Sequence, residues 1–183
     1  FNPEHDEKGR FAPGGGAGGG ESGGGAVKDP NAFVESLGIE PSSDSIAAVE
    51  GYQYFGYLGV NSMLRTPDEA DASDIKTGKK LKGKLDKAFD EAPSLPQDIE
   101  VYRGGRSSDL GVDSADALVG KTIVDNGYAS SSFKNDVAKS YANKYGDDGV
   151  VYRITVPKGT KILPFSGYKA RSPEHEVLLN RGG

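Results

Sequence analysis

Residues 174–179 read EHEVLL, and this short stretch near the end of the chain suggests both a strand and a site. Side chains of a strand alternate between its faces, so Glu174 and Glu176 are expected on one face and His175 on the other. Two like charges on one face repel each other, and a surface strand has no structural reason to keep them. Taken alone, the pattern is typical of a solvated strand end, and His175 receives no catalytic role.

Further strand candidates precede this stretch in the second half of the chain. Alternating or short apolar runs bounded by turn residues occur at 99–105, 127–133, 149–156 and 160–165. A short helix is expected between the second and third of these, over residues 135–146, with Gly146 at its end. The second half of the chain is therefore mostly strand.

The first half of the chain is helical. Apolar residues recur at helical spacing over residues 44–66, with Asp44 as the expected N-cap and a bend at Gly56 or Gly59. A second helix is expected over residues 75–91, before two prolines. Helices followed by strands predict an α+β fold.

Composition limits the other possibilities. Residues 1–26 are rich in glycine and predict a flexible linker, which leaves residues 27–183 as one folded domain. No apolar run is long enough to span a membrane, and the net charge of -5 argues against nucleic-acid binding. With no cysteine and two distant histidines, we expect no metal site.

One apparent nucleotide motif fails. Residues 119–122 read VGKT, like the end of a P-loop, but that motif requires glycine at the position of Ala115. A P-loop is therefore excluded.

Polar side chains lie on three separate strand candidates: Arg103 in VYRGG, Ser130 in GYASSSF, and the two glutamates of EHEVLL. This order resembles the arginine, serine, glutamate class of the ADP-ribosyltransferase exoenzyme family. The stretches YQYFGYLGVNSMLR and LKGKLDKAFDEAPSLPQDIEVYRGG are similar to the family too, so the resemblance covers residues 30–181. It implies N-terminal helices followed by a mixed, mainly antiparallel two-sheet core. The middle of the serine motif is Ser131, where threonine is commoner.

The resemblance implies chemistry that needs these residue types. Nicotinamide leaves the ribose of NAD through a cation-like transition state, which a carboxylate stabilises. The family places the second glutamate, Glu176, beside that ribose. The first, Glu174, faces the acceptor, and an E-x-E pair implies an arginine acceptor, whose guanidinium is always protonated in water. We therefore expect a mono-ADP-ribosyltransferase that uses NAD, without a metal, to modify a protein.

The same resemblance assigns the remaining site residues. Arg103 is expected to bind the anionic part of NAD, and the backbone of Gly104 to bind the nicotinamide amide. Ser130 is expected to hold the second glutamate in place. Phe133 is expected to stack on the nicotinamide ring, and Tyr168 to select the protein substrate. Each residue also has an ordinary structural interpretation, as a strand end, a solvated serine or a core aromatic.

Three alternatives remain open from the sequence. The same site would act as an NAD glycohydrolase if water replaced the protein acceptor. A non-catalytic virion or interaction domain could keep the fold, although Arg103, Ser130 and Glu176 are all present. A glycosidase would use two carboxylates, but its sugar cleft usually carries tryptophan, which this chain lacks.

The N-terminal stretch suggests a setting for the domain. Residues 5–16, HDEKGRFAPGGG, resemble linkers of bacteriophage head and portal-associated proteins. We therefore expect part of a larger polypeptide, either a virion-delivered effector or a secreted toxin, that modifies a host protein in the host cytoplasm. The family usually continues into another strand after the position of Gly183.

Overall fold

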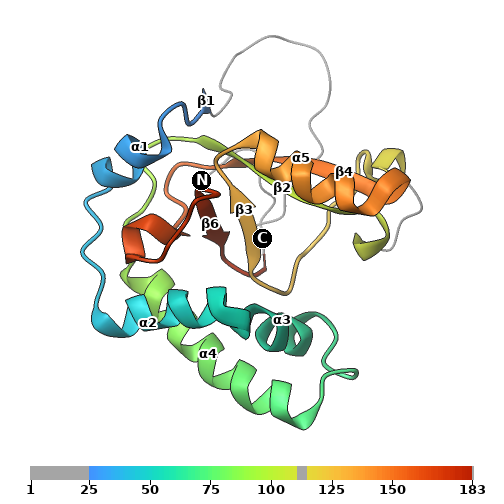
Figure 1. The fold of residues 1–183 in the computed structure, drawn as a ribbon, viewed down its shortest axis with the longest axis horizontal. Coiled ribbons are helices and arrows are strands. Elements are labelled where there is room, and N and C mark those ends of the chain that lie inside the picture. The colour runs from blue at the N-terminus through green and yellow to red at the C-terminus, as the bar shows by residue number, and fades with distance from the viewer. Residues whose placement is uncertain (1–24, 111–114, 183) are drawn as a thin grey trace.

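The structure, a computed structural model, describes residues 25–110 and 115–182 (Figure 1). Its α-helices are α1 (Pro30–Ser36), α2 (Ser43–Gly51), α3 (Tyr57–Arg65), α4 (Ala72–Glu91) and α5 (Asn135–Ala142). Its strands are β1 (Gly25–Ala26), β2 (Ile99–Arg106), β3 (Ala129–Ser132), β4 (Gly149–Val156), β5 (Ile162–Pro164) and β6 (Glu176–Leu179). Short 3₁₀ turns lie at Ser108–Leu110, Ala115–Leu118, Asn143–Asp148 and Phe165–Tyr168. None of the described helices is long and apolar enough to cross a membrane.

The strands are mainly antiparallel, as expected, but the expected division into two sheets is not seen among the described residues. The strand order is β1-β2-β3-β6-β5, and β4 pairs with β2 along its whole length. One residue pair, Tyr102 with Ser132, joins β2 to β3. Because only this pair joins β2 to β3, the single sheet can curl between these two strands.

Helices cover the sheet in two places. Figure 1 shows α2, α3 and α4 as one layer beside β3 and β6, and α5 against β2 and β4. The helical layer shares a core with the buried Tyr128, Leu163 and Leu178 from the sheet side. Tyr128 stacks on Phe89 of α4 with ring centroids 5.9 Å apart, which fixes the start of β3 against the helices.

The sheet begins earlier than the expected start of the folded domain. Gly25 and Ala26 of β1 pair in parallel with Ile99 and Glu100 at the start of β2. The rest of the expected linker, residues 1–24, lies outside the described residues. The helix α1, which the sequence analysis did not anticipate, follows directly and begins with the side chain of Asp29 as its N-cap.

The expected helix over residues 44–66 is interrupted. Its N-cap is Ser42, whose hydroxyl accepts the backbone N–H of Ser45, so the expectation of Asp44 as cap is wrong by two positions. A π-helical turn, Tyr52–Gly56, separates α2 from α3, and within it Phe55 has a φ of 69°. The bend therefore occurs at a bulky aromatic residue, a conformation that costs about 1 to 3 kcal/mol outside glycine.

The last strand is shorter than the EHEVLL pattern suggests. Strand β6 begins at Glu176, while His175 has a φ of 47° and Glu174 lies in the preceding turn. Simple strand alternation therefore does not place the two glutamates, and that expectation is wrong. The turn brings them together instead.

Candidate active site

A cavity of about 820 Å³ opens between the α2–α3 junction, the middle of β2 and β3, α5 and the turn before β6. Its size lies within the range of about 300–1,000 Å³ that is typical of small-molecule sites. The residues that line it are Tyr52, Gln53, Tyr57, Leu58, Asn61, Ser62, Arg65, Tyr102, Arg103, Gly104, Asp109, Ser130, Ser131, Ser132, Ala138, Tyr141, Tyr145, Ser172, Pro173, Glu174 and Glu176. Five expected site residues are among them: Arg103, Gly104, Ser130, Glu174 and Glu176.

Glu176 is the half-buried carboxylate of this cavity. Pairing between β6 and β3 sets Glu176 opposite Ser132, and its backbone N–H donates to the hydroxyl of Ser172. Burial raises the pKa of Glu176 to about 7; the nearby charge of Glu174 raises it too, while a hydrogen bond from Ser130 lowers it. A carboxylate that titrates near neutral pH at the edge of a cleft is typical of an active site.

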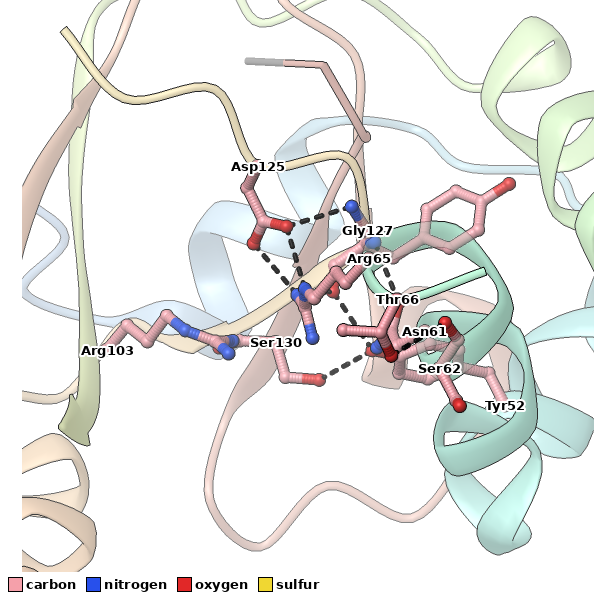
Figure 2. A network of polar contacts seen from close by, with 10 residues as sticks. Tyr52, Asn61, Ser62, Arg65, Thr66, Arg103, Asp125, Gly127 and Ser130 are labelled. Atoms are coloured by element: carbon pink, nitrogen blue, oxygen red, sulfur yellow. Dashed lines mark hydrogen bonds and ion pairs between the residues drawn. The ribbon is translucent and has the colours of Figure 1, made fainter. Parts of the chain in front are cut away.

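Ser130 connects this carboxylate to the helical layer. Its hydroxyl oxygen lies 3.3 Å from the hydroxyl of Tyr52, and Asn61 Nδ2 donates to the same tyrosine oxygen at 3.1 Å (Figure 2). Tyr52 in turn donates to the backbone carbonyl of Tyr128 at 3.4 Å. The position of Ser130 is therefore set by a buried polar network rather than by solvent.

Arg103 reaches the cavity from β2. One of its amino groups, Nη1, donates to the backbone carbonyl of Ser130 at 2.7 Å. Among the described residues it forms no ion pair with a carboxylate, while it also lines a second cavity of about 590 Å³ next to the first. A guanidinium without a carboxylate partner in a cleft is suited to bind an anion.

Gly104 allows α5 to lie close to β2. A Cβ atom there would come 2.1 Å from the backbone oxygen of Ala138 and 2.8 Å from the nitrogen of Ala142. The absence of a side chain thus places Tyr141 of α5 at the cavity, where its hydroxyl donates to the Glu174 carboxylate at 3.2 and 3.4 Å. Burial, and then the negative charge of Glu174, raise the pKa of Tyr141, so its hydroxyl remains a donor.

Two expected site residues do not reach the cavity. Phe133 is 4% exposed and packs edge-on against Phe33 of α1, with ring centroids 5.8 Å apart. Tyr168 is 1% exposed within the helical core. Both side chains are therefore buried in the core of this structure and do not face the cavity, while stacking of Phe133 on nicotinamide and substrate selection by Tyr168 stay predictions.

One positively charged side chain at the cavity, that of Arg65, was not predicted from the sequence. Arg65, the last residue of α3, lines both cavities and carries an ion pair with Asp125 at 2.7 Å. The available signal was its place at the end of the stretch YQYFGYLGVNSMLR, where it ends an apolar helix next to a polar Asn61. No group of three or more metal-ligating side chains occurs in the part of the chain that the structure describes.

Comparison with known families identifies the class of protein to which this fold and cleft belong. Residues 31–183 match the ADP-ribosyltransferase exoenzyme family, so the chain belongs to that family. Membership supports mono-ADP-ribosylation with NAD as the donor. No protein of curated function matches the sequence.

Solved structures of bacterial proteins share the fold. Exoenzyme S from Pseudomonas aeruginosa, in complex with human 14-3-3 protein beta and carba-NAD, is 26% identical, with a TM-score of 0.57 over 86% of this chain and 74% of that one. The Clostridium limosum C3 exoenzyme is 21% identical, with a TM-score of 0.63 over 84% and 81%. The toxin Plx2a from Paenibacillus larvae is 17% identical, with a TM-score of 0.61 over 84% and 80%.

Proposed function

We propose that this protein transfers ADP-ribose from NAD to an arginine side chain of another protein and releases nicotinamide. The observation that supports this most directly is the meeting of Glu174, Glu176 and Arg103 in one cleft. In the reaction, the bond between the ribose C1′ and the nicotinamide nitrogen breaks, and its electron pair stays with nicotinamide. A guanidinium nitrogen then bonds to C1′ and gives up a proton.

Glu176 is the residue proposed to stabilise the ribosyl cation. Its ionised carboxylate is partly withdrawn from water, so its attraction for a developing positive charge is screened less than at an open surface. The Tyr52 and Asn61 network keeps Ser130 in place beside it. This arrangement is fixed before the substrate arrives, which is the condition for electrostatic stabilisation of a transition state.

Glu174 is proposed to serve the acceptor. It lies in an exposed turn at the cavity, where a protein side chain has access, and Tyr141 holds its carboxylate from α5. A carboxylate matches the fork of a guanidinium and assists loss of its proton. This pairing supports arginine as the acceptor.

Three features of the cavity fit NAD. Arg103, without a carboxylate partner among the described residues, and Arg65 supply positive charge for the diphosphate. Ser131 adds a polar residue to the cavity wall, and its hydroxyl is buried without a hydrogen-bond partner in the described structure. Gly104 exposes backbone at the same wall.

The two glutamates separate the proposed function from the alternative of NAD hydrolysis. Glu176→Gln should lower both nicotinamide release and arginine modification by on the order of 10²-fold or more, the scale for one lost transition-state partner. Glu174→Gln should suppress arginine modification while much of the hydrolysis by water survives, because water needs less orientation than a guanidinium.

The measurement is parallel assay of nicotinamide release and of label transfer to an arginine-rich protein, with agmatine as a small arginine analogue. Equal loss of both activities in Glu174→Gln, or hydrolysis that survives Glu176→Gln, would contradict these roles. A wild-type protein that only hydrolyses NAD would favour the glycohydrolase. We further propose that this domain is part of a larger polypeptide that is delivered into a host cell and acts on a host protein. The resemblance of residues 5–16 to linkers of bacteriophage head and portal-associated proteins supports this proposal.

A further inference from the structure

The carboxylate of Asp125 binds one edge of the Arg65 guanidinium. Arg65 Nε and Nη2 donate to the two carboxylate oxygens of Asp125 at 2.7 and 2.8 Å, and Nη2 also donates to the backbone carbonyl of Tyr128 at 2.9 Å (Figure 2). The remaining amino group, Nη1, takes part in none of these bonds. A bidentate pair of this kind fixes the plane of the guanidinium.

The backbone at Gly127 contacts both members of this ion pair. Gly127 donates its N–H to Asp125 Oδ1 at 2.8 Å, so the carboxylate is held as well. A Cβ atom on Gly127 would lie 2.6 Å from Arg65 Nε and 2.8 Å from its Cζ. The guanidinium therefore occupies space that a larger residue at 127 would fill.

Arg65 lies at the cavities, where its free amino group can contact a ligand. It lines both cavities together with Arg103, and Figure 2 shows the two guanidinium groups approaching Ser130 from α3 and from β2. Both side chains in the ion pair are about one-third exposed, at 34% and 30%, so the pair borders the cleft rather than the core. Burial raises the pKa of Asp125, but hydrogen bonds from Arg65 and Gly127 outweigh it, and the carboxylate stays charged at neutral pH.

We propose that Asp125 is a positioning residue, which holds Arg65 edge-on so that its free amino group binds the diphosphate of NAD opposite Arg103. This inference rests on the proposed function and adds a residue to it. Asp125 itself touches no substrate. If Asp125 instead competed with NAD for Arg65, removal of the Asp125 charge would lower the KM for NAD instead of raising it.

Two variants disturb the pair in different ways. Asp125→Asn keeps an oxygen for Arg65 Nε and Gly127 but turns an amide N–H₂ toward Nη2, so the fork is broken. Gly127→Ala leaves every charge in place and introduces no backbone strain, but its Cβ would press on Arg65 Nε at 2.6 Å and also on Asn61 Oδ1 at 2.8 Å. Both should raise the KM for NAD, by about tenfold for Asp125→Asn, the scale of one charge-assisted hydrogen bond. Asp125→Asn should leave kcat within about threefold, whereas Gly127→Ala should lower kcat too, because it displaces Asn61 from the network that holds Ser130.

The experiment measures NAD-dependent nicotinamide release and equilibrium NAD binding for wild type, Asp125→Asn, Gly127→Ala, Arg65→Ala and the Arg65→Ala/Asp125→Asn pair. If Asp125 acts through Arg65, the double variant should bind NAD no more weakly than Arg65→Ala alone. A lower KM in Asp125→Asn, an unchanged KM in both single variants, or additive losses in the double variant would overturn the proposal. Wild-type protein that neither binds NAD nor releases nicotinamide would instead defeat the proposed function.

Discussion

At the scale of single residues, one hydroxyl connects α5 to the acceptor side of the cleft. Tyr141 donates to both oxygens of the Glu174 carboxylate, while Glu174 has no strand to hold it. Tyr141→Phe removes this donor and keeps the ring. We expect transfer to arginine to fall about three- to tenfold, while NAD hydrolysis changes little, because one exposed hydrogen bond contributes about 0.5–1.5 kcal/mol.

The ratio of transferred label to released nicotinamide is the quantity to measure. Tyr54→Phe is the matched control, since Tyr54 is 70% exposed and does not line the cavity. Combined with Glu174→Gln, Tyr141→Phe should cause no further loss of transfer. A parallel loss of both activities in Tyr141→Phe would show that the hydroxyl serves the cavity as a whole.

The polar residues that the sequence suggested for the site line the cavity, whereas the suggested aromatic residues do not. Arg103, Ser130 and the two glutamates are polar groups that strands and a turn leave facing the cleft. An aromatic ring gains about 1.5–3 kcal/mol by burial, so it enters the core wherever a partner exists. Phe133 finds that partner in Phe33, on a helix that the sequence analysis did not anticipate.

At the scale of elements, α5 lies against β2 because Gly104 has no side chain. Gly104→Ala places a methyl group against the backbone of α5, which cannot move aside as a side chain can. We expect a loss of about 2–4 kcal/mol in the free energy of unfolding, comparable to overpacking at a rigid contact, and a matching loss of transfer as Tyr141 shifts.

Gly105→Ala is the control on the same strand. Its Cβ would lie 3.4 Å from a ring carbon of Tyr152, an ordinary contact, so it should cost less than about 1 kcal/mol. Urea unfolding of both variants tests the contrast. Equal destabilisation would mean that α5 adjusts freely and that its position is not set by Gly104.

Element boundaries were harder to predict than element types. The helix break depends on Phe55, whose positive φ no local pattern signals, because aromatic residues rarely adopt it. The EHEVLL stretch has a strand pattern, but His175 leaves the strand conformation, and only the turn held by Ser172 explains where Glu174 lies. Both departures border the cavity, where local preference often gives way to function.

At the scale of the whole molecule, the sheet shows what sequence alone leaves undetermined. The pattern predicted an α+β chain, the family resemblance implied mainly antiparallel strands, and the structure has both. Whether the strands form one sheet or two depends on a single pair, Tyr102 with Ser132. Pairing between distant strands depends on three-dimensional register, for which periodicity carries little information.

Stability and activity of the whole molecule should respond to pH in opposite directions through Glu176. Its pKa is about 7 in the folded protein against an ordinary value of 4.5. Between these values the unfolded chain loses the proton that the folded protein keeps, so the free energy of unfolding falls as pH rises. Below the lower value both states are protonated, and the contribution to stability is fully present. Nicotinamide release needs the ionised carboxylate and should rise with a midpoint near pH 7.

Glu176→Gln separates the two effects, because glutamine stays neutral at every pH. At pH 8 we expect the variant to be more stable than wild type by about 1–3 kcal/mol, and near pH 4 the difference should vanish. Thermal unfolding of both proteins across this range measures it, with Glu174→Gln as the control for loss of an exposed carboxylate. A variant that is less stable at pH 8 would show that the folded protein favours the ionised form. In that case the pH dependence of nicotinamide release should have its midpoint below 4.5, the ordinary value for glutamate, instead of near 7.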